Sequence, residues 1–127
     1  MKQIIFVFMA ILLSAGMASA QDDAAASLLV SEDSHDFGAI KESGGKVSHA
    51  FVIKNDGTQP LVITRVIASC GCTSPDWTKE PIAPGKTGEV LVTYDPSGRP
   101  GPFAKTVSIY SNGKRGSQVL TIRGDVN

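Results

Sequence analysis

Short runs of alternating apolar and polar residues, separated by turn-forming residues, constrain the fold of this chain more than any other feature. Val47, His49, Phe51 and Ile53 occupy alternate positions, and the turn sequence Asn55-Asp56-Gly57 follows them. The same period recurs in three later runs, whose shared faces are Val90, Val92 and Tyr94; Phe103, Val107 and Ile109; and Leu120, Ile122 and Val126. A period of two residues is that of a strand with one buried face. The pattern therefore predicts antiparallel sheets packed through one side.

Three further strands are expected, around residues 28–32, at 35–40, and from Leu61 to about Ser69, with an irregularity at Arg65-Val66. About seven short strands in a domain of this size predict an immunoglobulin-like antiparallel β-sandwich. A disulfide between the sheets is excluded, because the chain's two cysteines stand two residues apart. The core must therefore be held together by packing.

The N-terminus has the pattern of a secretory signal peptide over residues 1–20. A basic start is followed by an apolar run from Ile4 to Leu13 and by the small-residue sequence Ala18-Ser19-Ala20, so cleavage is expected after Ala20. Residues 21–29 are expected to be a flexible lead-in, and residues 30–127 the sandwich domain. Because Gln21 rather than a cysteine follows the cut, no lipid anchor is expected. The mature protein should be soluble, without a membrane span, and periplasmic or extracellular.

The charges of the chain exclude two classes of partner. Its 12 basic and 12 acidic residues are dispersed, and no basic block or basic stripe with interleaved aromatics is present. Binding to nucleic acid or to a membrane surface is therefore not expected. The sequence contains no Gly-x-Ser-x-Gly motif. Gly85-Lys86-Thr87 lacks the first glycine of a phosphate-binding loop, since that position is Glu80. We expect a protein that is not an enzyme.

Several motifs resemble those of one known family. They are Asp36-Phe37-Gly38, Asn55-x-Gly57, Leu61-x-Ile63, Cys70-Gly71-Cys72-Thr73, Pro84-Gly85-Lys86 and Ser111-Asn112. From about His35 to Val126 the chain resembles the bacterial envelope family called domain of unknown function 1573. The resemblance implies an immunoglobulin-like sandwich related to the domains of cilia-associated and major-sperm-type proteins. It also implies a location in the cell envelope. No activity is established for that family, so the resemblance implies no reaction.

Cys70 and Cys72, with Gly71 between them, leave three interpretations open. In an oxidising compartment the pair can close a small disulfide ring, because Gly71 tolerates unusual backbone angles. If that ring is exposed and easily reduced, the protein could have a thiol-redox function. As thiolates, the two cysteines would suit a soft ion such as Cu(I). As structural residues they would be small apolar groups at a strand end or in a loop, which is the interpretation we favour.

The remaining candidate site residues are Trp77 and the two histidines, His35 and His49. Zinc bound at the cysteine pair would need two more ligands, and nothing in the sequence places either histidine near residue 70. We interpret both as surface or half-buried strand side chains, and we expect no metal and no cofactor. Trp77 is expected in a loop, where it covers one end of the core; the alternative is an exposed binding anchor.

The sequence as a whole predicts an exported, non-catalytic envelope protein that acts as a binding or structural module. Its partner would be a protein or carbohydrate of the cell envelope, and the sequence specifies neither that partner nor the oligomeric state. The alternative is a thiol-redox or copper-binding periplasmic protein that uses Cys70 and Cys72. The inference from fold to binding is an analogy.

Overall fold

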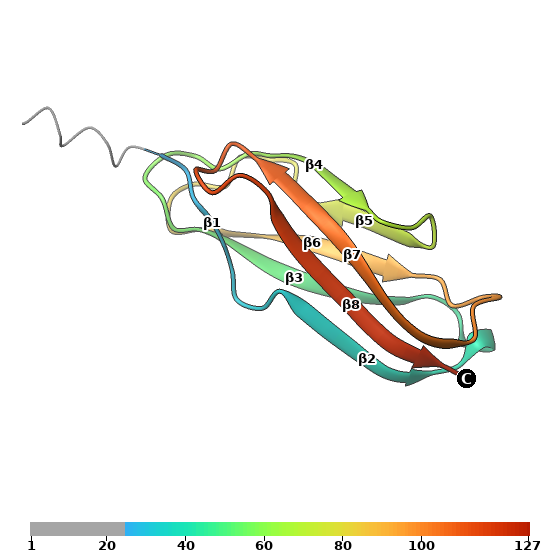
Figure 1. The fold of residues 1–127 in the computed structure, drawn as a ribbon. Coiled ribbons are helices and arrows are strands. Elements are labelled where there is room, and N and C mark those ends of the chain that lie inside the picture. Colours follow the sequence, from blue (N-terminus) through green and yellow to red (C-terminus); the bar gives the residue numbers. More distant parts are fainter. Residues whose placement is uncertain (1–24) are drawn as a thin grey trace, which may run out of the picture.

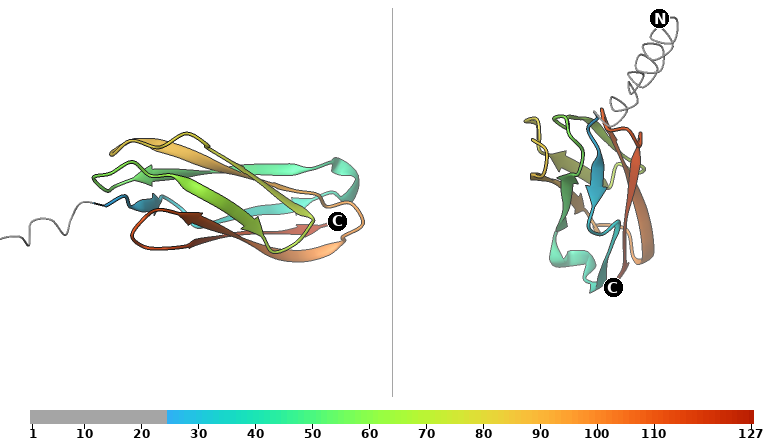
Figure 2. Two further views of the ribbon diagram at one scale, coloured as in Figure 1. Left: turned by 90° about the horizontal axis from the view of Figure 1, so that it is seen from above. Right: turned by 90° about the vertical axis from the view of Figure 1, so that its left-hand side faces the viewer.

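The computed structural model describes residues 25–127, in which eight strands form two four-stranded sheets that pack face to face (Figures 1 and 2). The predicted signal peptide (1–20) and the start of the predicted lead-in (21–24) lie outside the described residues. The described part contains one short 3₁₀ turn, Glu42–Gly44. No helix in residues 25–127 is long and apolar enough to cross a membrane.

The first sheet has the strand order β1-β3-β6-β5, and the second has the order β2-β8-β7-β4. The strands of the first sheet are β1 (Leu28–Val30), β3 (Val47–Asn55), β6 (Thr87–Tyr94) and β5 (Thr73–Trp77). Those of the second are β2 (Ser34–Ile40), β8 (Gln118–Val126), β7 (Gly101–Ser111) and β4 (Ile63–Ala68). The immunoglobulin-like sandwich predicted from the alternation is confirmed.

The prediction of purely antiparallel sheets is wrong at one strand pair. β2 pairs with β8 in parallel, from Ser34 opposite Thr121 to Ile40 opposite Val126, and the register shifts between Asp36 and Ala39. The physical reason is that β1 and β2 are two parts of one strand run that changes sheets: β1 pairs antiparallel with β3, and the chain then crosses to the second sheet and lies along β8 (Figure 1). All other strand pairs are antiparallel.

The structure has one strand more than expected, because β5 was interpreted as a loop. Pro75 stands in its middle and its residues do not alternate clearly, so no strand is predicted there from the pattern. β5 pairs only with β6 and is the edge of the first sheet, where a proline is tolerated. The predicted irregularity near Arg65 is confirmed as a register shift between Ile63 and Arg65.

The core lies between the sheets and consists of the residues that the alternation places on inward faces. Phe51, Ile53, Val90, Val92 and Ile109 are completely buried, and Val107 and Ile122 are 1% exposed. Each such side chain contributes about 1.5–3 kcal/mol by leaving water. Tyr94 is also buried, and it stacks on Phe103 with the ring centroids 4.0 Å apart. Within the core, this stacked pair connects β6 of the first sheet with β7 of the second.

The folded part begins earlier than the predicted lead-in of residues 21–29 allows. Ala26, Ser27 and Leu28 are buried, and β1 pairs with the end of β3. Asn55 explains this burial, because its Oδ1 accepts hydrogen bonds from the N–H of Ser27 and of Gly57. The small residues that we interpreted as a lead-in therefore pack against the β3 turn, and any lead-in ends before Ala26.

Candidate functional site

The Cys70–Cys72 pair forms a disulfide in the connection between β4 and β5, with the two Cα atoms 5.2 Å apart. Three hydrogen bonds donated by backbone N–H groups hold this turn. The N–H of Cys72 donates to Cys70 Sγ at 3.1 Å, that of Thr73 to the Cys70 carbonyl, and that of Asp95 to the Cys72 carbonyl. Cys72 is 6% exposed and belongs to the core cluster. In this arrangement both sulfurs bond to each other, so the turn offers no thiolate pair to an ion.

Trp77 lies on β5 and not in a loop as we expected. It pairs with Val90, a fully buried core residue, so its ring turns inward, is half-buried and packs against the core. The Lys79 ammonium lies 3.5 Å from the centroid of the indole ring, a cation–π contact. The position agrees with the core-covering interpretation, and a binding role for Trp77 stays a prediction.

Asp76 fixes the Lys79 side chain over that ring. Lys79 Nζ donates a hydrogen bond to Asp76 Oδ1 at 3.1 Å, and the N–H of Trp77 donates to the same oxygen at 2.9 Å. The Lys79 hydrogen bond, followed by the Trp77 N–H, lowers the pKa of Asp76 below its ordinary value of 3.8. Next to this group is a small hollow of about 200 Å³, lined by Asp76, Trp77, Thr78, Glu89 and Leu91.

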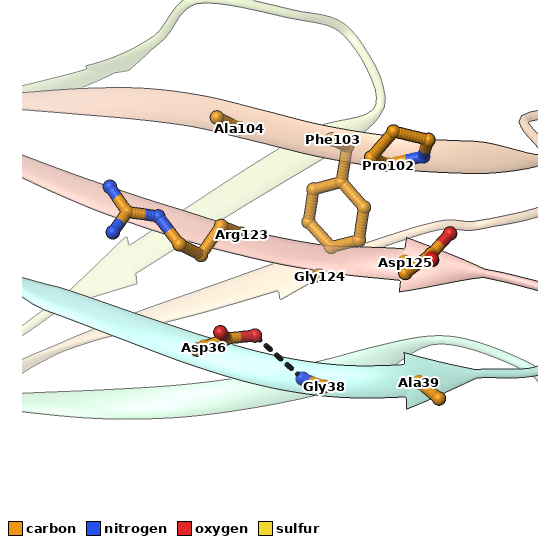
Figure 3. Close-up of a pocket in the computed structure, with 9 residues that line it drawn as sticks. All are labelled: Asp36, Gly38, Ala39, Pro102, Phe103, Ala104, Arg123, Gly124 and Asp125. Atoms are coloured by element: carbon orange, nitrogen blue, oxygen red, sulfur yellow. Dashed lines mark hydrogen bonds between the residues drawn. The ribbon is translucent and has the colours of Figure 1, made fainter.

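A larger hollow of about 520 Å³ lies against the second sheet, across β2, β8 and β7 (Figure 3). Its lining residues are Asp36, Gly38, Ala39, Pro102, Phe103, Ala104, Arg123, Gly124 and Asp125. The side chains of Arg123 and Asp125 point outward, since they alternate with the buried residues Ile122 and Val126. The hollow therefore opens on the solvent side of the sheet.

Local backbone chemistry shapes this hollow. Gly38 has φ 70°, a conformation that other residues rarely adopt, and its N–H donates to Asp36 Oδ1 at 2.8 Å, as the dashed line in Figure 3 shows. Gly124 pairs with Phe103, and a methyl group at Gly124 would lie 2.8 Å from the Phe103 ring. Gly38 thus allows the bulge in β2, and Gly124 leaves space on β8 for the Phe103 ring.

The hollow combines charged groups with apolar surface. Asp36, Arg123 and Asp125 supply the charges, while Pro102 and Ala104 supply apolar surface, because the Phe103 ring turns inward and stacks on Tyr94. Within residues 25–127, the Arg123 guanidinium has no protein hydrogen-bond or ion-pair partner, so its five donors remain available. Such a surface can bind a ligand that carries a carboxylate, phosphate or hydroxyl group next to an apolar face. Sequence reasoning missed it, because three strands far apart in the chain contribute to it.

Sequence reasoning also missed that the two histidines meet. His35 on β2 and His49 on β3 stack with their ring centroids 3.7 Å apart and their planes 8° apart. Both are half-buried, as expected, and Glu32 lies beside them. No local signal could have shown this, since the histidines belong to different sheets and are fourteen positions apart.

Comparison with known proteins identifies the fold and the family. The chain matches the model of a family described as "Protein of unknown function (DUF1573)" over residues 28–126. No curated protein matches it. Three similar solved structures are a Porphyromonas gingivalis W83 protein of unknown function, PapD-like domain 7 of human CEP192, and the secreted serine protease VesC of Vibrio cholerae.

The three likenesses differ in how much of each protein they cover. The P. gingivalis protein has TM-score 0.70 and 18% identity, with 85% of this chain and 50% of that chain covered. The CEP192 domain has TM-score 0.66 and 11% identity, with 82% and 87% covered. VesC has TM-score 0.58 and 15% identity, with 86% and 25% covered. The chain thus spans half of the first protein and a quarter of VesC.

At these identities the structural likenesses show the fold alone, which is immunoglobulin-like and PapD-like. The family match is of another kind, because it extends from the first residue of β1 to the last residue of β8. It includes the disulfide turn, the histidine pair and the strands of the larger hollow. The chain therefore belongs to the DUF1573 family of proteins of unknown function.

Proposed function

We propose that this protein is an exported, non-catalytic binding module of the bacterial cell envelope, which holds a protein or carbohydrate partner in the hollow of its second sheet. The observation that carries the proposal is that hollow of about 520 Å³, which lies within the size range of ligand sites, about 300–1,000 Å³. The residues that line it belong to or adjoin paired strands, which keeps the site preformed.

The chemistry of the hollow supports recognition rather than a reaction. The Asp36 carboxylate is held by the N–H of Gly38 and so shapes the β2 bulge. Arg123 offers a planar set of donors that suits carboxylate or phosphate groups and can also hydrogen-bond a sugar. The apolar surface of Pro102 and Ala104 lies beside it. This combination suits an extended peptide or a glycan that lies across the strands.

Two features support export. The N-terminal sequence has the order of a signal peptide, a basic start, an apolar run and a small-residue cleavage site. In addition, Cys70 and Cys72 are joined as a disulfide, and such bonds persist in oxidising compartments. The structural neighbour VesC is described as secreted, and a domain of this fold is one part of that longer chain.

Site-specific photo-crosslinking in cells tests the proposal. A photoreactive amino acid at Ala104, which lines the hollow, should give a defined adduct in the envelope fraction. The matched control is Val52, an exposed position on the outer face of the other sheet. Arg123→Ala should remove most of the Ala104 adduct, and mass spectrometry should find the partner chemically unchanged. Equal adducts at both positions, or a partner cleaved or modified by the pure protein, would contradict the proposal.

A further inference from the structure

The chain's only two histidines lie on different sheets and meet at one open edge of the sandwich. β1 pairs only with Ile53–Asn55 of β3, so the earlier half of β3 has no strand partner on that side, and β2 is the edge of the second sheet. His49 pairs with Val92, and His35 with Ile122. Since both partners are core residues, both imidazoles turn inward, toward the space between the sheets.

Glu32 joins the two histidines from the connection between β1 and β2. Its Oε1 lies 2.5 Å from His49 Nε2, and each of the three residues offers one ligand atom within 4.8 Å of the other two. Two imidazole nitrogens and one carboxylate oxygen are a donor set that suits zinc and copper. We propose that Glu32, His35 and His49 bind one divalent transition-metal ion of the zinc or copper type. Because the Glu32 side chain is 49% exposed, water or a donor of a partner can complete the coordination.

Two phenylalanines flank the histidine pair. Phe37 contacts the His35 ring edge-to-face and Phe51 contacts that of His49, each with centroids 4.7 Å apart. Phe51 is fully buried, so the row of four rings is anchored in the core at that end. The outer end of the site is more open, because the Glu32 side chain is 49% exposed and that of His49 is 22% exposed. The site is therefore anchored in the core at the Phe51 end and accessible to solvent at the Glu32 end.

The parallel stacking of the histidine rings predicts how an ion would enter. A metal–imidazole bond lies in the plane of its ring, so two parallel rings cannot both point at one ion. A tetrahedral zinc ion with bonds of about 2.0–2.1 Å holds its nitrogen ligands about 3.3 Å apart, in ring planes that converge on it. Binding must therefore open the stack, at the side of β3 where the residues before Ile53 have no strand partner.

Titration with zinc chloride tests the site, on the full protein purified without a histidine tag. At about pH 7.5 calorimetry should give one ion per chain, and the NMR signals of both imidazole rings should shift together as the stack opens. No heat of binding, or binding that leaves both imidazole signals in place, would overturn the proposal.

Substitutions separate this site from adventitious binding elsewhere. Glu32→Gln should weaken zinc binding at least tenfold, and His35→Gln or His49→Gln about 100-fold. The matched control is Glu80→Gln, an exposed carboxylate in the loop before β6, which should not change the affinity. Glu32 is exposed enough that its variant keeps the fold. This variant therefore tests the site even if a histidine variant fails to fold. Equal zinc affinity in Glu32→Gln and the wild type would refute the assignment.

Discussion

Asn55 uses the full hydrogen-bonding capacity of its amide group at a completely buried position. Its Oδ1 accepts from Ser27 and Gly57, and its Nδ2 donates to the carbonyls of Gln59 at 2.7 Å and Ile82 at 2.9 Å. One side chain thus joins the residue before β1, the turn after β3 and the loop before β6. The sequence showed Asn55 only as part of a turn, because the partners on which its role depends come from separate segments.

Asn55→Asp should therefore destabilise the protein by about 3 kcal/mol or more near neutral pH. The new carboxylate oxygen would face the carbonyl oxygens of Gln59 and Ile82 without a proton to donate. Burial raises the pKa of such a carboxyl, so the loss should shrink as the pH falls toward about 4. Urea denaturation at several pH values measures this.

A matched control is Asn112→Asp. The Asn112 amide makes a similar pair of bonds, from the N–H of Val62 and to the carbonyl of Pro60, at an exposed position. Water can replace those bonds, so this variant should lose much less stability. An equal loss in both variants would show that burial does not explain the effect.

The Asp76 carboxyl gives a second test at the scale of single residues. Lys79→Ala should raise the pKa of Asp76 toward 3.8, because the lysine hydrogen bond contributes most to lowering it. A lowered pKa stabilises the fold above about pH 4, and that contribution is lost as the pH falls through the lowered pKa. Carboxyl NMR titration measures the change, with Lys54→Ala on the outer face of β3 as the control. An unchanged Asp76 pKa would contradict the contact.

At the scale of elements, the strands with the most regular alternation are the ones that the sequence predicts correctly. β3, β6 and β8 alternate cleanly, and the residues expected on their inward faces are buried or half-buried. β5 breaks the pattern with Pro75 and was missed, so Trp77 was misplaced as well. The parallel pairing of β2 was missed for another reason, because alternation defines a strand's faces but not its neighbour or direction.

The face assignment of β3 can be tested with two neighbouring residues. Phe51→Ala should cost about 3–5 kcal/mol, because the completely buried ring leaves a cavity between the sheets. Val52→Ala should cost about 0.5 kcal/mol or less, since Val52 is 46% exposed on the opposite face of the same strand. Thermal and urea denaturation of both variants measure the difference. Similar losses would mean that the assignment is wrong.

The disulfide turn between β4 and β5 should be dispensable for folding. Replacing Cys70 and Cys72 together by serine should lower the free energy of unfolding by no more than about 2 kcal/mol, because so short a ring restrains the unfolded chain little. Circular dichroism should keep its β-sheet signal. A double variant that fails to fold would make the turn itself essential.

The same pair of cysteines distinguishes the competing functions. If they act in thiol exchange, the wild-type disulfide should equilibrate with a glutathione buffer, whereas a structural disulfide resists it. If they bind copper, the reduced wild type should bind Cu(I) and the double variant should not. We expect neither result, because the turn is held by backbone hydrogen bonds and Cys72 belongs to the core.

At the scale of the whole molecule, the sequence predicted the sandwich but not the sites on it. The core depends on a period that is visible within each strand. The hollow of the second sheet and the histidine pair depend instead on which strands become neighbours. His35 and His49 meet because β2 and β3 border the same open edge of the two sheets, a relation that their local sequences do not contain.

Export is also a prediction about the whole chain. The mature protein recovered from the envelope fraction should begin at Gln21, because Ala18-Ser19-Ala20 follows an apolar run of signal-peptide length. Intact-mass measurement checks this directly. A species that retains residues 1–20 would show that no cleavage takes place after Ala20.

The parallel pairing of β2 and β8 has a mechanical consequence. The described chain enters at one end of the elongated sandwich and leaves at the other (Figure 1). A force that pulls these ends apart draws the start of β2 and the end of β8 in opposite directions. Because the two strands run parallel, the hydrogen bonds between them are loaded together in shear and cannot open one after another. We therefore expect the β2–β8 pair to resist such a force more strongly than a strand pair whose hydrogen bonds open in turn.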